Sequence, residues 1–361
     1  MLLTRGRSWA TATRMHPGQW CWVTKARSST FSQVAASAVE NAGMPIDVPM
    51  KAQPSQPGSM GYSETRDRWE ALTRLHASAV RSLCSENDAG PVLTLQQAAI
   101  ETHDRAPETT LYHLVSDARV AVDHYSSRHA LFAFVVARLM AQRLDWGQAD
   151  LRSIELAALT MNASMTQIQN RLATTERRPE PSDKAAIDRH AEDSAAVLAT
   201  TSLAGDVCVE VVRLHHKLPP EGGVESWAAP VRLAAALRRA DMFTAKLSRR
   251  GARSPTSPLW AAREVCLSGK TPDMLGAALL KSLGLYPAGT MVELINREVC
   301  IVVRQTERAD KPVVAMFIDD QGVPSVRAGL RSTSAAAFAV KRALASSQIR
   351  QRPPHERIFP S

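Results

Sequence analysis

Apolar residues recur every three or four positions through the middle of the chain, which is the spacing that buries one face of a helix. Residues 129–144 read HALFAFVVARLMAQRL and predict a helix with a broad apolar face. The segment GDVCVEVVRLHHK at 205–217 shows the same period and ends in two adjacent histidines. Further helices are predicted on this spacing over 63–82, 146–160 and 227–247.

The period changes after residue 287. β-branched residues alternate with others over 291–295 and 300–304, on either side of an Asn-Arg-Glu turn, and 313–318 adds a third strand. The pattern therefore predicts a mainly α protein with a small C-terminal antiparallel β hairpin or sheet. An alanine-rich stretch at 334–346 predicts a terminal helix, and the polar, proline-bounded stretch 167–181 predicts a loop.

A length of 361 residues allows two or three domains. The first part is rich in Ser, Thr, Gly and Pro and is expected to be disordered, and Met1, Met44, Met50 and Met60 are all plausible starts. We divide the chain into a disordered N-terminal extension, an N-terminal helical module, a helical domain, a small β tail, and a terminal helix with a disordered tail. In the same order, these five parts cover residues 1–60, 61–122, 123–285, 286–322 and 323–361.

Composition narrows the class of protein. Hydrophobic residues make up 45% and aromatic residues 5%, as in a helical protein with a sizeable core. Five cysteines without C-x-x-C spacing favour reduced thiols and a cytoplasmic protein. The net charge of +9 belongs mostly to the two ends, 1–45 and 323–361, so no nucleic-acid groove is expected on a folded face. No apolar run reaches membrane-spanning length.

Candidate chemistry gathers on the helical segments. His129, His190, the doublet His215-His216 and Asp241 each lie near an apolar face of a separate segment. Imidazole and carboxylate groups are common metal ligands, and helices that converge can bring them together. A surface histidine pair near a helix end is the alternative for the doublet, because positive charge is favourable there.

The order His…His…His-His…Ala-Asp resembles the HD-GYP domain of the HD phosphohydrolase superfamily over roughly residues 120–320. The segment 283–303, LGLYPAGTMVELINREVCIVV, resembles the strand-forming tail that often follows that domain. The resemblance implies an HD-superfamily helical bundle core, and metal ligands at His129, His190, His215, His216 and Asp241. Members of that family hydrolyse cyclic di-GMP at a site with two or three metals.

The chain departs from the family pattern at the chemistry. Met161-Asn162 stands where the family has its His-Asp doublet, and Met165 replaces the family lysine. Tyr125 takes the place of an acidic ligand, and Thr244 that of the second aspartate. The Gly-Tyr-Pro sequence is absent. Asparagine is neutral and methionine is a poor ligand for harder metals, so no intact catalytic set is expected.

Three functions follow from this comparison. The first is a degenerate, inactive HD-GYP-like protein of bacterial cyclic-dinucleotide signalling, which acts by binding a cyclic dinucleotide or a signalling protein partner. The second is a metal-dependent phosphohydrolase, a cyclic di-GMP phosphodiesterase with a rearranged site. The third is a structural helical protein with relict histidines. The residual ligands imply at most one divalent metal (Fe, Mn or Zn), and neither nucleic acid nor membrane is expected as a partner.

Overall fold

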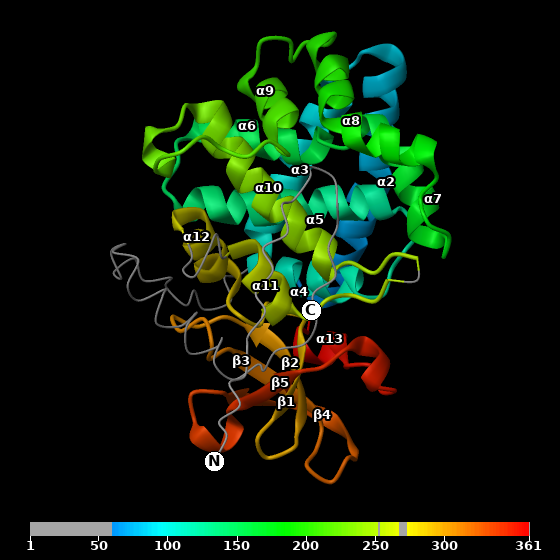
Figure 1. Ribbon diagram of the computed structural model, residues 1–361. Helices are drawn as coiled ribbons and strands as arrows, with labels where there is room; N and C mark the ends of the chain where they lie inside the picture. Colours follow the sequence, from blue (N-terminus) through cyan, green and yellow to red (C-terminus); the bar gives the residue numbers. More distant parts are fainter. Residues whose placement is uncertain (1–59, 252, 267–272, 361) are drawn as a thin grey trace, which may run out of the picture.

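The computed structural model describes residues 60–251, 253–266 and 273–360. A bundle of helices forms the larger part of the molecule, and a small antiparallel sheet lies at one end of it (Figure 1). The predicted fold class is confirmed. The disorder expected for 1–60 falls, apart from its last residue, outside the described residues.

Three helices precede the centre of the bundle. A long amphipathic helix buries Trp69, Leu72 and Leu83 and ends at Asn87, whose left-handed backbone stops it. The Trp69 indole donates to the Thr110 hydroxyl at 3.0 Å, which ties the first helix to the third. The three are α2 (Tyr62–Glu86), α3 (Gly90–Arg105) and α4 (Pro107–Ala118).

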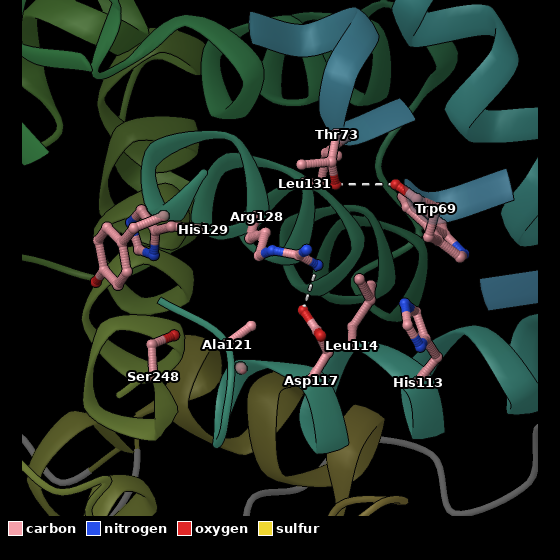
Figure 2. A pocket seen from close by; sticks show the side chains of 12 residues that line it. Trp69, Thr73, His113, Leu114, Asp117, Ala121, Arg128, His129, Leu131 and Ser248 are labelled. Carbon is pink, nitrogen blue, oxygen red and sulfur yellow. Dashed lines mark hydrogen bonds and ion pairs between the residues drawn. The ribbon is translucent and has the colours of Figure 1, made fainter. Parts of the chain in front are cut away.

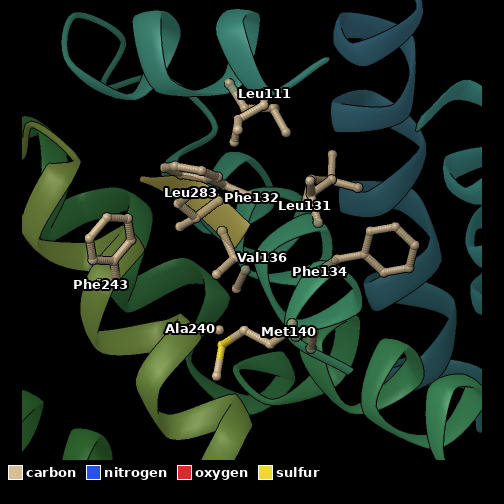
Figure 3. Packing of buried hydrophobic residues seen from close by; sticks show 14 of the residues in the cluster. Leu111, Leu131, Phe132, Phe134, Val136, Met140, Ala240, Phe243 and Leu283 are labelled. Atoms are coloured by element: carbon tan, nitrogen blue, oxygen red, sulfur yellow. The ribbon is translucent and has the colours of Figure 1, made fainter. Parts of the chain in front are cut away.

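The centre of the bundle is α5 (Tyr125–Arg143), which is buried along most of its length. An apolar surface on nearly every side is what a helix enclosed by other helices requires. Figure 3 shows Phe132 and Val136 of this helix packed in the core with Phe243 of a later helix. Helix α6 (Gln148–Thr160) packs along α5 and leads into a short 3₁₀ turn, Ala163–Met165.

The remaining bundle helices pack against α5 or against one another. Residues predicted as a loop over 167–181 are partly helical, so that prediction is wrong. Most side chains there face solvent, and an Arg171–Asp183 ion pair links the segment to the next helix. These helices are α7 (Thr166–Thr174), α8 (Pro181–Ala199), α9 (Val207–Leu214), α10 (Ala229–Leu247), α11 (Pro258–Cys266) and α12 (Met274–Leu283).

The sheet has five antiparallel strands in the order β4-β3-β2-β1-β5. It extends beyond the segment 286–322, and the terminal helix predicted over 334–346 is wrong, because this stretch contains an edge strand. Glu293 of the neighbouring strand pairs with Lys341 and Arg342 of that edge strand. The elements are β1 (Met291–Leu294), β2 (Val299–Arg304), β3 (Val313–Ile318), β4 (Pro324–Ser332), β5 (Val340–Ala343) and a final turn of helix, α13 (His355–Ile358).

Candidate metal centre

Four helices bring the predicted ligands to one side of the bundle. His129 lies in the first turns of α5, His190 in the middle of α8, and Asp241 in the second half of α10. His215 and His216 follow the last residue of α9 directly. Helix α9 packs against both α8 and α10, so this end of α9 lies between the helices that carry the other residues.

Three of the histidines form a compact triad. The Nε2 atom of His190 lies 3.3 Å from Nε2 of His215 and 3.1 Å from Nε2 of His216. One ligand nitrogen from each ring can be chosen so that all three lie within 4.8 Å of one another. His190 and His215 are buried and His216 is exposed, so the triad has a closed side and a side open to solvent.

Hydrogen bonds fix the tautomers of the two buried rings. His190 Nδ1 lies 2.5 Å from the Ile187 carbonyl oxygen, and His215 Nδ1 lies 2.6 Å from the Val212 carbonyl oxygen. A carbonyl oxygen only accepts, so each Nδ1 carries a proton and donates it. In the neutral rings both Nε2 atoms therefore present lone pairs.

Two lone pairs that face each other at 3.3 Å repel, unless a cation lies between them. Metal-binding histidines commonly donate their second ring N–H to a backbone carbonyl, as His190 and His215 do here. Burial lowers the pKa of the His215 imidazole to about 3 and also lowers that of His190. Both rings are therefore held neutral, which is the form that binds a metal. The donor set fits a divalent cation.

His129 and Asp241 form a separate pair. His129 Nε2 lies 2.8 Å from Asp241 Oδ1, and because a carboxylate only accepts, this nitrogen carries the proton. Nε2 of His129 therefore has no free lone pair for a metal. Burial alone would raise the pKa of Asp241, but the hydrogen bond from His129 holds it well below its usual range.

The positions where the chain departs from the HD-GYP pattern are buried. Met161, Asn162 and Met165 are 0%, 5% and 8% exposed. The Asn162 amide nitrogen has no hydrogen-bond partner among the described residues, so a donor stands there where the family has a charged ligand. Thr244 lies 3.4 Å from His129 Nδ1, but its hydroxyl donates to the Ala240 carbonyl.

Tyr125 and three arginines lie around this centre, and the sequence pattern assigned no role to the arginines. The Tyr125 ring stacks on His129 with centroids 5.8 Å apart, and its buried hydroxyl has no partner among the described residues. The guanidinium of Arg250 lies 5.9 Å from the Tyr125 ring centroid. Arg238, Arg250 and Arg253 form no ion pair with a described carboxylate. The signal that could have revealed them is their clustering around and just after Asp241.

A small cavity lies on the other side of His129. It has a volume of about 20 Å³, enough for about one water molecule. Figure 2 shows Arg128 and Asp117 joined across it, at 2.8 Å. Burial raises the pKa of Asp117 to about 6 despite the neighbouring guanidinium of Arg128. This cavity is too small for an organic substrate.

No protein-family model, curated protein or solved structure matches the chain. Among the described residues, no helix combines the length and the apolar character needed to cross a membrane. The assignment of a function therefore depends on the geometry of the centre and on the resemblance in its sequence.

Proposed function

We propose that the chain is a one-metal, non-hydrolytic HD-GYP-like protein that binds a phosphodiester, such as a cyclic dinucleotide, in bacterial signalling. The observation that carries the proposal is the convergence of His190, His215 and His216, with the two buried tautomers fixed. An exposed histidine pair at a helix end would have no reason to hold its lone pairs toward a third ring. The triad therefore supports a bound cation.

The residues that would hold the metal are three neutral imidazoles, a set that suits zinc or iron and, less well, manganese. Three protein ligands leave room for an oxygen ligand. A metal held there would polarise that oxygen.

Hydrolysis is not expected from this arrangement. A two-metal site needs further charged ligands, but Asn162 and Met161 are neutral. Nε2 of His129 donates to Asp241 at 2.8 Å, and its Nδ1 lies 3.4 Å from the Thr244 hydroxyl, so neither nitrogen joins the triad. Met165 supplies no positive charge. The centre keeps ligands for one cation, but it lacks the charged ligands that a second metal ion would need.

The arginines support an anionic ligand. Arg238 precedes Asp241 by one helical turn, and Arg250 lies over the Tyr125 ring. Guanidinium groups match the geometry of phosphate oxygens. A phosphodiester offers acceptors to these groups and an oxygen to the metal.

The test combines three measurements on one purified sample of the full chain. Elemental analysis should find about one metal per chain, lost in His190→Ala and kept in the exposed control Lys217→Ala. Calorimetry should show cyclic di-GMP binding that weakens in Arg250→Ala. A phosphodiesterase assay should show no turnover.

Each other result selects another function. Turnover that His190→Ala abolishes would establish the rearranged hydrolase. A metal-free protein that binds no cyclic dinucleotide would leave the histidines as relics in a structural helical protein. Metal without ligand binding would refute the signalling role and keep only the cation site.

A further inference from the structure

A groove of about 500 Å³ lies where the helical bundle meets the sheet. Its walls are the first turn of α2, the end of β3 with the start of β4, and residues 351–357. In Figure 1 the labels α13 and β4 lie at the opposite end of the molecule from α8 and α9, which carry or adjoin the triad. The groove is thus separate from the candidate metal centre.

The C-terminal wall of the groove is firmly attached to the helices. The Tyr112 hydroxyl lies 2.7 Å from His355 Nδ1, and the Tyr62 ring stacks on the His355 ring with centroids 4.8 Å apart. Phe359 packs edge-on against Tyr112, and its carbonyl oxygen accepts from the Tyr62 backbone at 3.1 Å. This wall is a built part of the fold, although the sequence analysis expected a disordered tail here.

The lining carries an excess of positive charge. Three arginines, Arg66, Arg352 and Arg357, line the groove against one carboxylate, Glu356. Arg66 contacts Asp67 at 2.9 Å and Glu356 at 3.8 Å, so this guanidinium and both carboxylates are partly engaged. Arg352 is exposed and forms no ion pair with a described residue. The positive end of the helix α2 adds to the same field.

We propose that this groove binds a small organic phosphate. The volume is that of a small-molecule site. Guanidinium groups at Arg66 and Arg352 suit a phosphate group. Pro324 at the start of β4 and Pro354, neither of them buried, give the groove an apolar side against which an organic moiety packs. The arginines bind the phosphate group of the ligand, and its compact organic part lies against the sheet.

The experiment titrates the full chain with three probes by calorimetry: phenyl phosphate, benzoate and inorganic phosphate. Phenyl phosphate should bind most tightly, since it alone supplies both the dianion and the apolar ring. Arg352→Ala should weaken it roughly tenfold or more, because a charge-assisted hydrogen bond is lost. Arg350→Ala, two residues away and outside the lining, is the matched control and should leave binding unchanged.

Several outcomes would overturn the proposal. One is the absence of binding by any probe at millimolar concentration. Another is equal weakening by Arg352→Ala and Arg350→Ala, which would indicate attraction to net charge alone. Tighter binding of benzoate would make the ligand a carboxylate. Loss of phenyl phosphate binding in His190→Ala would place the site at the metal centre. Arg350 and Arg352 are both exposed, so replacing either with alanine leaves the fold intact.

Discussion

His129 donates from Nε2 to Asp241 Oδ1 at 2.8 Å, across 112 positions of sequence. This contact separates the five ligands expected from the sequence into a pair and a triad. The pair satisfies itself, because the proton lies on the nitrogen and the carboxylate accepts it. In the triad of His190, His215 and His216, the two buried rings direct Nε2 lone pairs toward each other, so this is the part of the centre suited to a cation.

Asp241→Asn should therefore leave the metal content close to that of the wild type. The fold should lose on the order of 1–2 kcal/mol in free energy of unfolding, because an amide oxygen accepts more weakly than a carboxylate. Elemental analysis and urea unfolding of the same preparation measure both effects. If Asp241→Asn loses its metal as His190→Ala does, Asp241 is a ligand and the division into pair and triad is wrong.

The central helices were predictable from the sequence because their burial is periodic. Helix α5 is the extreme case, because apolar residues, interrupted by the charge at Arg138, recur so often that nearly every side is buried. The incorrect prediction of a helix over 334–346 has a physical reason. Alanine favours a helix, but Val340 and Arg342 pair with β1, and tertiary pairing overrides local propensity.

The site was only partly predictable. The order of the histidines and Asp241 pointed to residues that the helices place on one side of the bundle, as a pair and a triad. Sequence could not show that Asp241 pairs with His129 or that His190 Nδ1 donates to a carbonyl, because both depend on distances set by packing. The cationic groove was missed because residues 351–357 were expected to be disordered.

Restoring the family residues tests the resemblance itself. Met161→His, Asn162→Asp and Met165→Lys combined should raise the metal content above that of the wild type, because they return an imidazole and a charged ligand. Met165→Lys alone is the control, since it adds no ligand. Met161 is fully buried, so circular dichroism must show that the triple variant folds. No gain in metal in a folded variant would count against the alignment of these positions.

As the pH is lowered, the fold should begin to lose stability at a pH well above the pKa values of its buried histidines. Burial lowers the pKa of His113 to about 3 and that of His76 to about 4, whereas a histidine in the unfolded chain titrates near 6.5. Below about pH 6.5 the unfolded state binds more protons, so stability falls as pH falls, by at most about 1.4 kcal/mol per pH unit for each such group.

Urea unfolding at pH 7.5, 6 and 5, with a chelator present to remove metal effects, measures this slope. His113→Asn should flatten it. The exposed His124 is the matched control, and His124→Asn keeps a residue that tolerates its left-handed backbone. A stability that does not change between pH 7.5 and 5 would contradict the buried, neutral state of these rings.

A buried ion pair holds three helices together. Arg138 of α5 pairs with Glu155 of α6 and lies 3.0 Å from Asp104 of α3, and Gln96 donates to Glu155 at 2.8 Å. Glu155 is only 1% exposed. Arg138→Met should cost about 3–5 kcal/mol in free energy of unfolding, because it leaves this carboxylate buried without a cation.

The double variant Arg138→Met, Glu155→Leu should recover much of that loss. It removes the uncompensated charge, and apolar side chains of similar volume can replace a buried pair at little cost. Urea unfolding compares the two variants, and Arg308→Ala, which breaks an exposed pair with Asp310, should change stability by less than about 1 kcal/mol. A double variant no more stable than Arg138→Met would show that the pair itself, with Gln96 and Asp104, stabilises the bundle beyond the cost of burying its charges.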